Sequence, residues 1–362
     1  MSETRIPVEA IKGRGAASRI AHRFSKDARA AFDDGWGTLD EDAMAAGSPV
    51  ATEIIWEDAH SVISSNKSPD IDFDHSINPY RGCEHGCIYC FARPTHSYLN
   101  MSPGLDFETK IIAKRNIAQV LRAELARRSY VPKSLCIGTV TDCYQPIERD
   151  LRLTRSVIGV LKEAQHPLYL ISKSSGVERD LDLLVPMAER RMAAVYITIT
   201  TLDGALARRL EPRAASPQRR LRTIRTLTEA GVPVGVSCAP QIPFINEDME
   251  QVLAAAWDAG ARSAFYTVLR LPWEVAPLFR EWLSLHYPDR ADRVMGRVQD
   301  MRGGRDYDSD FSTRMKGSGI WSELIRQRFQ KTCAKLGYRT DRGGLDLTQF
   351  QRPSLHGQQS LF

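Results

Sequence analysis

Short apolar stretches alternate with longer amphipathic stretches along residues 70–285 of this 362-residue chain. The short stretches are rich in β-branched and aromatic residues, which indicates strands, and the longer ones have the length and spacing of helices. Strands that are almost continuously apolar are typical of a parallel sheet covered by helices. The predicted strands are 75–80, 134–141, 168–172, 194–200, 232–239 and 263–269, and the predicted helices are 109–128, 150–164, 177–190, 216–230, 247–259 and 274–285. The alternation predicts an α/β fold, and it fits an open doubly wound sheet as well as a barrel.

The segments on either side of this α/β region have a different composition. We expect residues 1–69 to form a partly disordered, flexible N-terminal arm and residues 286–345 to form a basic extension with a helix at 319–335. The polar residues 346–362 are expected to form an extended tail. Basic residues between positions 12 and 26 are compatible with an arm that contacts nucleic acid, although a solvated arm has the same composition.

The overall composition is that of a globular protein with a mild positive charge. Hydrophobic residues make up 43% of the chain and charged residues 26%, which excludes disorder of the whole chain. No apolar run approaches the roughly 18 residues of a transmembrane helix, and the first residues lack the apolar core of a secretory signal. We therefore expect a cytoplasmic protein without membrane contact. The net charge of +5 permits binding of nucleic acid without requiring it.

Three of the seven cysteines lie within eight positions, directly after the first predicted strand. Cys83, Cys87 and Cys90 have the spacing C-x3-C-x2-C, and so short a loop can direct three thiolates at one metal centre. Three thiolates would leave one iron of a [4Fe–4S] cluster without a protein ligand, and that iron could bind a small molecule through an amine and a carboxylate. A zinc site completed by His85 or His96 is one alternative, and three unliganded thiols are another.

This triad, with the aromatic Tyr89 before its last cysteine, resembles the signature of radical S-adenosylmethionine (radical SAM) enzymes. The resemblance implies a [4Fe–4S] cluster on Cys83, Cys87 and Cys90, with S-adenosyl-L-methionine (SAM) chelated to the fourth iron. It implies that one electron from the cluster cleaves SAM to methionine and a 5′-deoxyadenosyl radical, which abstracts a hydrogen atom from the substrate. An electron donor is then a required partner. The fold of this superfamily is a partial (β/α)6 TIM-type barrel, in agreement with the six predicted strands.

Within this superfamily, the chain is most similar to the spore photoproduct lyase branch, over roughly residues 70–270. The similarity is carried by the blocks TDCYQPIERDL, YLISKSSGVERDLDLL, ITITTLD, LEPRAASPQRRLRTIRTLTEAGVPVGV and APQIP. That lyase repairs a thymine dimer in DNA by hydrogen abstraction, so the resemblance implies a lyase-like enzyme of DNA repair. RNA, a peptide or a small molecule are alternative substrates, and a non-catalytic iron–sulfur sensor or scaffold is an alternative function.

The same blocks imply residues that contact SAM. Lys173, at the end of the third predicted strand, matches a lysine of the lyase and would neutralise the methionine carboxylate. Thr198 and Thr200 lie on one face of the fourth strand, and one of them corresponds to a cofactor-contacting serine of the lyase. An exposed lysine at a strand end and two threonines that only favour a strand are the structural alternatives.

Further cofactor contacts are implied at the ends of neighbouring strands. Glu211 and Arg213 follow the fourth strand and would reach the ribose and carboxylate of SAM, or pair with each other at the surface. Main-chain groups of Ala239 and Pro240, at the end of the fifth strand, would border the adenine. Asp142, just past the second strand, is a candidate for contact with cofactor or substrate, or a helix N-cap.

One catalytic feature of the lyase is displaced in this chain. The lyase has a cysteine after its second strand that returns a hydrogen atom to the product radical. The corresponding position here is Thr139, and Cys143 is the nearby thiol that could still face the cavity. We assign Cys143 as the candidate hydrogen donor, with a buried inert thiol as the alternative.

The last five residues, Gln358 to Phe362, read QQSLF. This ending resembles the pentapeptide by which bacterial replication and repair proteins bind the sliding clamp, through apolar side chains in a pocket and a hydrogen-bonding glutamine. The resemblance implies the sliding clamp as a partner, and an ordinary chain end is the alternative.

Overall fold

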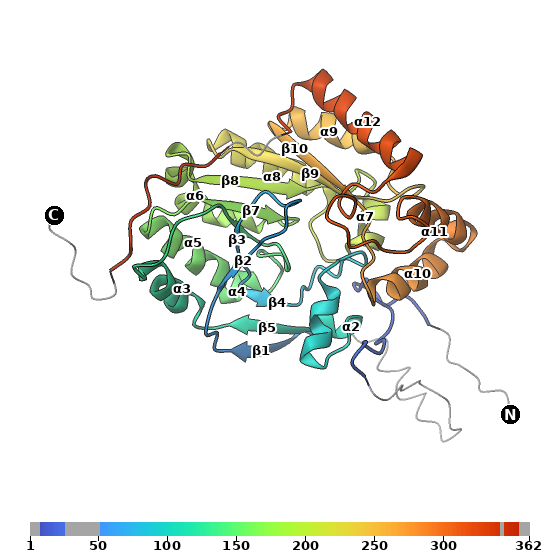
Figure 1. Cartoon of the computed structure of the whole chain (residues 1–362), viewed down its shortest axis with the longest axis horizontal. Helices are drawn as coiled ribbons and strands as arrows, with labels where there is room; N and C mark the ends of the chain where they lie inside the picture. Colours follow the sequence, from blue (N-terminus) through green and yellow to red (C-terminus); the bar gives the residue numbers. More distant parts are fainter. Residues whose placement is uncertain (1–7, 26–50, 341–343, 355–362) are drawn as a thin grey trace.

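The computed structural model describes residues 8–25, 51–340 and 344–354. Its centre is a seven-stranded sheet with the strand order β10-β9-β8-β7-β6-β3-β2 (Figure 1). The six strands from β3 to β10 in this sheet are parallel and follow each other in chain order, whereas β2 is antiparallel at one edge. The strands are β2 Ile63–Ser65, β3 His75–Ile77, β6 Leu135–Ile137, β7 Leu168–Ser172, β8 Ala193–Thr198, β9 Val234–Gln241 and β10 Ser263–Val268. The two edge strands of the described sheet do not pair, so the barrel is partial.

Helices follow the parallel strands and cover the outer face of the sheet (Figure 1). They are α3 Ile117–Ala126, α4 Glu148–Leu151, α5 Leu153–Glu163, α6 Leu181–Glu189, α8 Pro217–Glu229, α9 Met249–Asp258 and α12 Gly319–Leu336. The sequence marks the start of α8 clearly, because the Ser216 hydroxyl accepts a hydrogen bond from the Arg219 N–H and Pro217 occupies the first helical position. The predicted partial (β/α)6 barrel is confirmed.

A second, smaller sheet lies beside the barrel, with the order β1-β5-β4. Its strands are β1 Glu53–Glu57, β4 Tyr80–Arg81 and β5 Lys110–Lys114. The prediction of one helix over 109–128 is wrong in its first part, since β5 occupies five of these residues. The sequence KIIAK has no decisive period, and its β conformation depends on parallel pairing with β1, which is far away in the sequence. The segment predicted as an N-terminal arm therefore contributes strands β1 and β2.

The remaining short elements lie at the carboxyl end of the barrel and around it. They are η1 Arg93–Leu99, α2 Leu105–Thr109, η2 Ser175–Asp180, α7 Gly204–Leu210, α10 Val275–His286, η3 Pro288–Arg290 and α11 Ala291–Asp300. The predicted helix at 319–335 corresponds to α12. No helix of the described residues has both the length and the apolar character needed to cross a bilayer.

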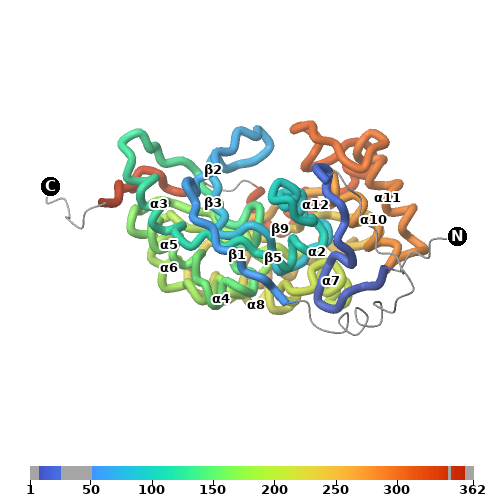
Figure 2. Tube along the Cα trace, turned by 90° about the horizontal axis from the view of Figure 1, so that it is seen from below, coloured from blue at the N-terminus to red at the C-terminus, as the bar shows by residue number. Residues whose placement is uncertain are grey.

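Residues 8–25 have no regular secondary structure and pack along η1, α2 and α10 (Figure 2). The Leu105 N–H donates to the Ser18 carbonyl at 3.2 Å, and the Ser18 hydroxyl donates to Glu281 at 2.9 Å. The basic side chains of this segment pair with acids of the barrel: Arg19 lies 3.1 Å from Asp106. This part of the predicted arm is therefore docked on the protein, and residues 26–50 lie outside the described residues.

Two contacts tie the C-terminal third to the rest of the barrel. Arg314 Nη2 lies 2.7 Å from Asp70 Oδ1, and this mostly buried pair joins the segment beside β10 to the loop before β3. Residues 344–354 run across the amino ends of the parallel strands, where the Gln351 N–H donates to the Ala164 carbonyl at 2.9 Å. The described part of the predicted tail is extended and held in place.

Candidate functional site

The loop that carries Cys83, Cys87 and Cys90 lies at the carboxyl end of the barrel and closes into two successive turns. The Gly86 N–H donates to the Cys83 carbonyl at 3.3 Å, and the Cys90 N–H donates to the Cys87 carbonyl at 3.2 Å. Burial raises the pKa of the Cys83 thiol, and the charges of Asp142, Cys87 and Cys90 raise it further. The three thiols thus lie within electrostatic range of one another, as ligands of one metal centre must.

A fully buried arginine holds the backbone of this loop. Arg93 Nε donates to the Cys87 carbonyl at 3.0 Å, and its Nη2 donates to the Gly86 carbonyl at 3.1 Å. The same Nη2 pairs with the carboxylate of Glu108, which is also fully buried. Gly86 has φ +66°, a conformation that strains any other residue. Sequence reasoning missed Arg93 and Glu108, because nothing in their local sequence separates them from surface charges.

The N-terminal segment is docked directly on the cysteine loop. Glu108 accepts hydrogen bonds from the N–H groups of Gly15 at 3.0 Å and Ala16 at 2.9 Å. A Cβ atom on Gly15 would lie only 1.8 Å from the Gly86 carbonyl oxygen, so the two backbones are in contact. One buried carboxylate therefore links the N-terminal segment, Arg93 and the cysteine loop.

Side chains from the neighbouring βα loops hold the other side of the cysteine loop. The Gln145 Oε1 accepts from the Glu84 N–H at 2.8 Å, and Glu84 Oε2 accepts from the Ile147 N–H at 2.6 Å. Arg213 Nη2 lies 3.2 Å from Glu84 Oε1. Arg213 therefore pairs with the cysteine loop and not with Glu211.

Asp142 connects three loops at this end of the barrel. Its carboxylate accepts from the Ser172 hydroxyl and the Lys173 N–H, each at 2.7 Å, and lies 3.3 Å from His85 Nδ1. Burial alone would raise the pKa of Asp142, but the nearby His85 and Lys173 and these hydrogen bonds lower it below its ordinary value. The ionised carboxylate of Asp142 therefore holds the backbone of Lys173 and the cysteine loop in fixed positions.

The centre of the site is a buried carboxylate, Glu211, surrounded by donors. Tyr89, Thr200 and Arg220 all donate hydrogen bonds to its two oxygens. Arg220 also donates from Nη1 to the Thr198 carbonyl at 2.9 Å, which fixes the end of β8. Burial would raise the pKa of Glu211, but Arg220, then Lys173 and the hydroxyl donors, lower it, so the group is an anion.

Lys173 lies near the Tyr89 ring and within electrostatic range of Glu211 and the Cys87 thiol. Its Nζ is 5.9 Å from the centre of the Tyr89 ring. Burial would lower the pKa of Lys173, but the charges of Cys87, Glu211 and Asp142 raise it, which keeps the lysine protonated. The structure thus brings together seven of the predicted residues: the three cysteines with Tyr89, Lys173, Thr200 and Glu211.

The other predicted residues lie at different distances from this centre. Thr198 contributes its carbonyl to Arg220, so of the two threonines Thr200 supplies the hydroxyl at the centre. Ala239 and Pro240 lie at the end of β9, where the Pro240 carbonyl accepts from Asn246 Nδ2 at 2.9 Å. Asn246 donates from the same nitrogen to the Thr200 carbonyl, which links the ends of β8 and β9.

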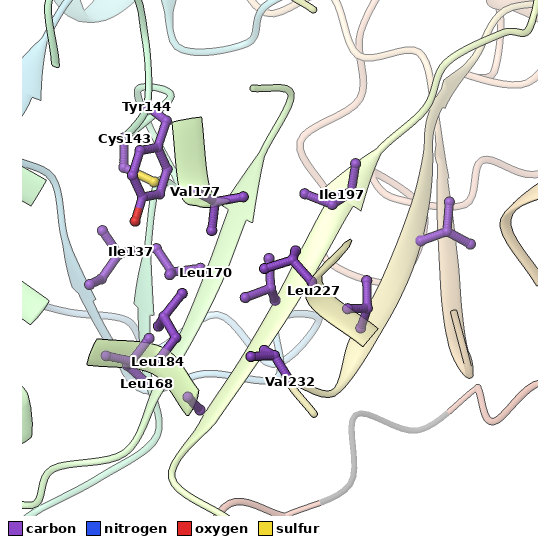
Figure 3. Packing of buried hydrophobic residues seen from close by; sticks show 14 of the residues in the cluster. Ile137, Cys143, Tyr144, Leu168, Leu170, Val177, Leu184, Ile197, Leu227 and Val232 are labelled. Carbon is purple, nitrogen blue, oxygen red and sulfur yellow. The ribbon is translucent and has the colours of Figure 1, made fainter. Parts of the chain in front are cut away.

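Cys143 lies away from the thiol cluster, on the face of the sheet that the helices cover. It is fully buried and packs with Ile137, Leu170, Tyr144 and Val177 (Figure 3). Burial raises the pKa of this thiol, and its Sγ is 3.8 Å from the Ile171 carbonyl. This position corresponds to the inert buried thiol that was the alternative in the sequence analysis.

The two histidines proposed as a fourth zinc ligand have other neighbours: His85 Nδ1 faces Asp142, and His96 Nε2 lies 3.0 Å from the Lys110 carbonyl. Within the described ranges, no group of three or more His, Cys, Asp or Glu side chains is arranged for a single ion. Three soft thiolates with protonated Lys173 and Arg220 nearby suit a larger anionic cluster.

Comparison with known proteins identifies the family of the chain. The family model of the radical SAM superfamily matches residues 77–256. An uncharacterized protein of Mycobacterium tuberculosis (strain ATCC 25618 / H37Rv) is 36% identical over 234 residues, which are 63% of this chain and 69% of that protein. An uncharacterized protein of Methanocaldococcus jannaschii is 28% identical over 247 residues, which are 68% of this chain and 88% of that protein. The chain therefore belongs to the radical SAM superfamily, as the cysteine triad predicted.

The fold is shared with solved structures of spore photoproduct lyase. A structure of that lyase complexed with dinucleoside spore photoproduct superposes with a TM-score of 0.51 at 16% identity, and the match covers 79% of this chain and 80% of the lyase. Another has bound AdoMet and dinucleoside spore photoproduct, with a TM-score of 0.50 at the same identity and coverage. At this level of identity the likeness establishes the fold.

Proposed function

We propose that this protein is a radical SAM enzyme that holds a [4Fe–4S] cluster on Cys83, Cys87 and Cys90 and binds SAM at the open iron. When bound, the cluster and SAM supply one-electron cleavage of the sulfonium to methionine and a 5′-deoxyadenosyl radical, which abstracts a hydrogen atom from the substrate. The observation that carries the proposal is the single loop with Cys83, Cys87 and Cys90 at the carboxyl end of the partial barrel, with Lys173 beside Tyr89 of that loop. A separate electron donor is required.

The protein's own groups would bind and orient the cofactor. Lys173 provides the positive charge for the methionine carboxylate, and Asp142 fixes the lysine backbone by accepting its N–H. Glu211, already paired with Arg220, holds the Tyr89 and Thr200 hydroxyls in fixed orientations. The cover formed by residues 8–25 shields the back of the cysteine loop from water.

For the substrate we propose nucleic acid, with DNA first and lyase-like repair as the reaction. Support comes from the fold shared with a lyase that binds a dinucleoside photoproduct and from the net charge of +5. The burial of Cys143 on the helix-covered face argues against this thiol as the hydrogen donor, so the reaction need not follow the lyase in its last step. RNA, a peptide or a small molecule, and a sensor without turnover, are the alternatives that the experiments below separate.

Anaerobic reconstitution with iron and sulfide, followed by reduction in the presence of SAM, tests the proposal. The expected product is 5′-deoxyadenosine, detected by chromatography. Cys90→Ala should abolish both the brown cluster absorbance and this product. Cys333→Ala is the matched control, because Cys333 lies on α12 and is buried in the hydrophobic core. This variant should keep the cluster absorbance. A stable cluster that never yields 5′-deoxyadenosine would favour the sensor.

Two further parts of the proposal concern the cell. We place the enzyme in the cytoplasm, where thiols stay reduced.

The ending that resembles a clamp-binding pentapeptide, Gln358 to Phe362, lies outside the described residues, and the sliding clamp stays a proposed partner. Co-purification of the clamp with the full chain, compared with a chain that ends at residue 354, tests it.

A further inference from the structure

Arg270 lies at the mouth of the barrel, next to the cysteine triad. It follows β10 and places its guanidinium carbon 5.1 Å from the centre of the Phe91 ring. Phe91 comes directly after Cys90 and is 45% exposed. Two segments from opposite edges of the partial barrel, the loop after the cysteines and the loop after β10, therefore meet at this arginine.

Arg270 and its neighbour Arg302 carry positive charge without a partner acid. Within the part of the chain that the structure describes, no carboxylate lies in salt-bridge range of either guanidinium. Arg302 donates to the carbonyls of Leu269 at 2.7 Å and Thr313 at 3.0 Å, and Arg270 donates to the Met315 thioether and the Tyr307 hydroxyl, each at 3.4 Å. The Nε atoms of both arginines are buried and have no acceptor. Burial, and then the charge of Arg270, lower the pKa of Arg302 to about 10, so the two cations repel each other.

The acids nearest to these arginines are occupied elsewhere. Asp70 accepts two hydrogen bonds from Arg314, and Asp308 accepts from the Thr313 hydroxyl and the Asp310 N–H. Arg280, by contrast, has its own carboxylate in Asp306. A buried Arg302 and a partly buried Arg270 thus lie together at the mouth of the barrel without a carboxylate of the described residues in salt-bridge range.

Two further exposed rings belong to the same two segments of the chain. Tyr98 is 69% exposed and Trp273 is 62% exposed, and both contact the guanidinium of Arg23, whose charge Glu274 neutralises at 2.8 Å. Trp273 is three residues beyond Arg270, and Tyr98 is seven residues beyond Phe91. Although Arg23 lies against both rings, each residue stays mostly exposed, which leaves ring surface for a further planar ligand.

We propose that Arg270 binds a phosphate of an unpaired nucleic-acid strand and that Phe91, Trp273 and Tyr98 stack its bases. This inference rests on the proposed function and specifies the form of its substrate. A phosphate would satisfy the planar donors of Arg270, with Arg302 behind it adding to the local positive potential. Exposed rings can stack only on bases whose faces are open, which selects a single strand over a duplex. An acidic peptide would satisfy the arginines but would leave the row of rings without a function.

Binding of a fluorescein-labelled single-stranded oligonucleotide to the reconstituted holoprotein, followed by anisotropy, tests this site. Arg270→Gln should weaken binding by about tenfold or more, the effect of a charged hydrogen bond. It should also reduce the slope of log affinity against log salt by about 0.7, the value for one phosphate contact on a single strand. Trp273→Ala should weaken binding with little change in that slope. Arg225→Gln, the same change of charge on the exposed face of α8, is the control and should alter neither quantity.

The opposite results are equally clear. The proposed binding site is wrong if Arg225→Gln weakens binding as much as Arg270→Gln, or if the matched duplex binds as tightly as the single strand. It is also wrong if polyglutamate displaces the strand when both are present at the same concentration of negative charge. Assay of 5′-deoxyadenosine in the same samples separates this result from the proposed function. Wild-type protein that binds the strand but never forms 5′-deoxyadenosine would overturn the radical chemistry and leave the binding site standing.

Discussion

At the scale of single residues, the site depends on charges that have been removed from water. Glu211 and Arg220 are both almost completely buried, and each makes further hydrogen bonds besides the ion pair. Removing one member of such a pair leaves the other charge buried and uncompensated, which costs far more than the pair itself contributes.

Glu211→Gln should therefore destabilise the protein by roughly 3–5 kcal/mol, because Arg220 loses its counter-charge. Urea unfolding of the protein without cofactors at neutral pH measures the change. Glu178→Gln is the control: Glu178 also pairs with an arginine, Arg219, but on a partly exposed surface, where the expected loss is about 0–1 kcal/mol. Equal losses in the two variants would contradict this account of Glu211.

Lys173→Gln should weaken SAM binding by about tenfold or more, because the carboxylate of SAM loses a charged partner. Equilibrium dialysis of labelled SAM against the reconstituted, unreduced protein measures this affinity without turnover. Lys162→Gln, on the exposed surface of α5, is the control and should bind SAM as the wild type does. Unchanged binding in Lys173→Gln would remove Lys173 from the cofactor site.

At the scale of elements, the cysteine loop is held by segments that are distant in sequence. The blocks TDCYQPIERDL and YLISKSSGVERDLDLL contact each other here: the Tyr144 hydroxyl donates to Asp180 at 2.9 Å, and Arg179 Nη2 lies 2.8 Å from Glu148 Oε1. Their charged residues form one network behind the loop. The similarity that pointed to a family thus marks residues that build the support of the site.

Gly15→Ala should detach the N-terminal segment, since its Cβ would collide with the Gly86 carbonyl oxygen. The expected results are faster trypsin cleavage after Arg14 or Arg19 and faster loss of cluster absorbance in air. Gly159→Ala, within α5 and with open space around the added methyl group, is the control and should be neutral or slightly stabilising. Trypsin cleavage at the wild-type rate in Gly15→Ala would show that the contact does not hold the segment.

The sequence was sufficient for the parallel strands and the outer helices, because each has a local signature in its period, and for the family, because the spacing of the cysteine triad is distinctive. It was insufficient for β5, whose conformation is decided by pairing with β1, and for the partners of Glu211 and Arg213. Two opposite charges at i and i+2 could pair with each other, yet here Glu211 pairs with Arg220 of α8 and Arg213 pairs with Glu84 of the cysteine loop. Arg93 and Glu108 likewise support the cysteine loop only because they are buried together, and no local sequence pattern predicts that burial.

At the scale of the whole molecule, the C-terminal segment closes the end of the barrel opposite the site. Phe350 packs on Tyr130 and His166, with ring centres 5.5 Å and 5.6 Å apart. His166 is fully buried, and its ring nitrogens lie 2.8 Å from the Tyr130 hydroxyl and 2.8 Å from the Pro167 carbonyl. A neutral imidazole satisfies both contacts, with one nitrogen donating and the other accepting.

Stability should therefore fall in acid partly through His166. Burial lowers the pKa of His166 from 6.5 to about 4, so between these values the unfolded chain binds a proton that the folded chain does not. As the pH falls through this window, the folded state loses up to about 3 kcal/mol relative to the unfolded state. Urea unfolding at pH 7 and pH 4.5 should show a smaller decline for His166→Asn than for the wild type, and parallel declines would exclude this histidine as a source.

The contacts of residues 8–25 also constrain the order in which the chain can fold during translation. Gly15 leaves the ribosome before the thiols it will cover, but the anchors Glu274 and Glu281 are translated only after the last strand of the sheet. The contacts of this segment with Glu108 need only the cysteine loop and α2, whereas those with Glu274 and Glu281 need α10. Completion of α10 therefore adds the last anchors that hold residues 8–25 beside the cysteine loop.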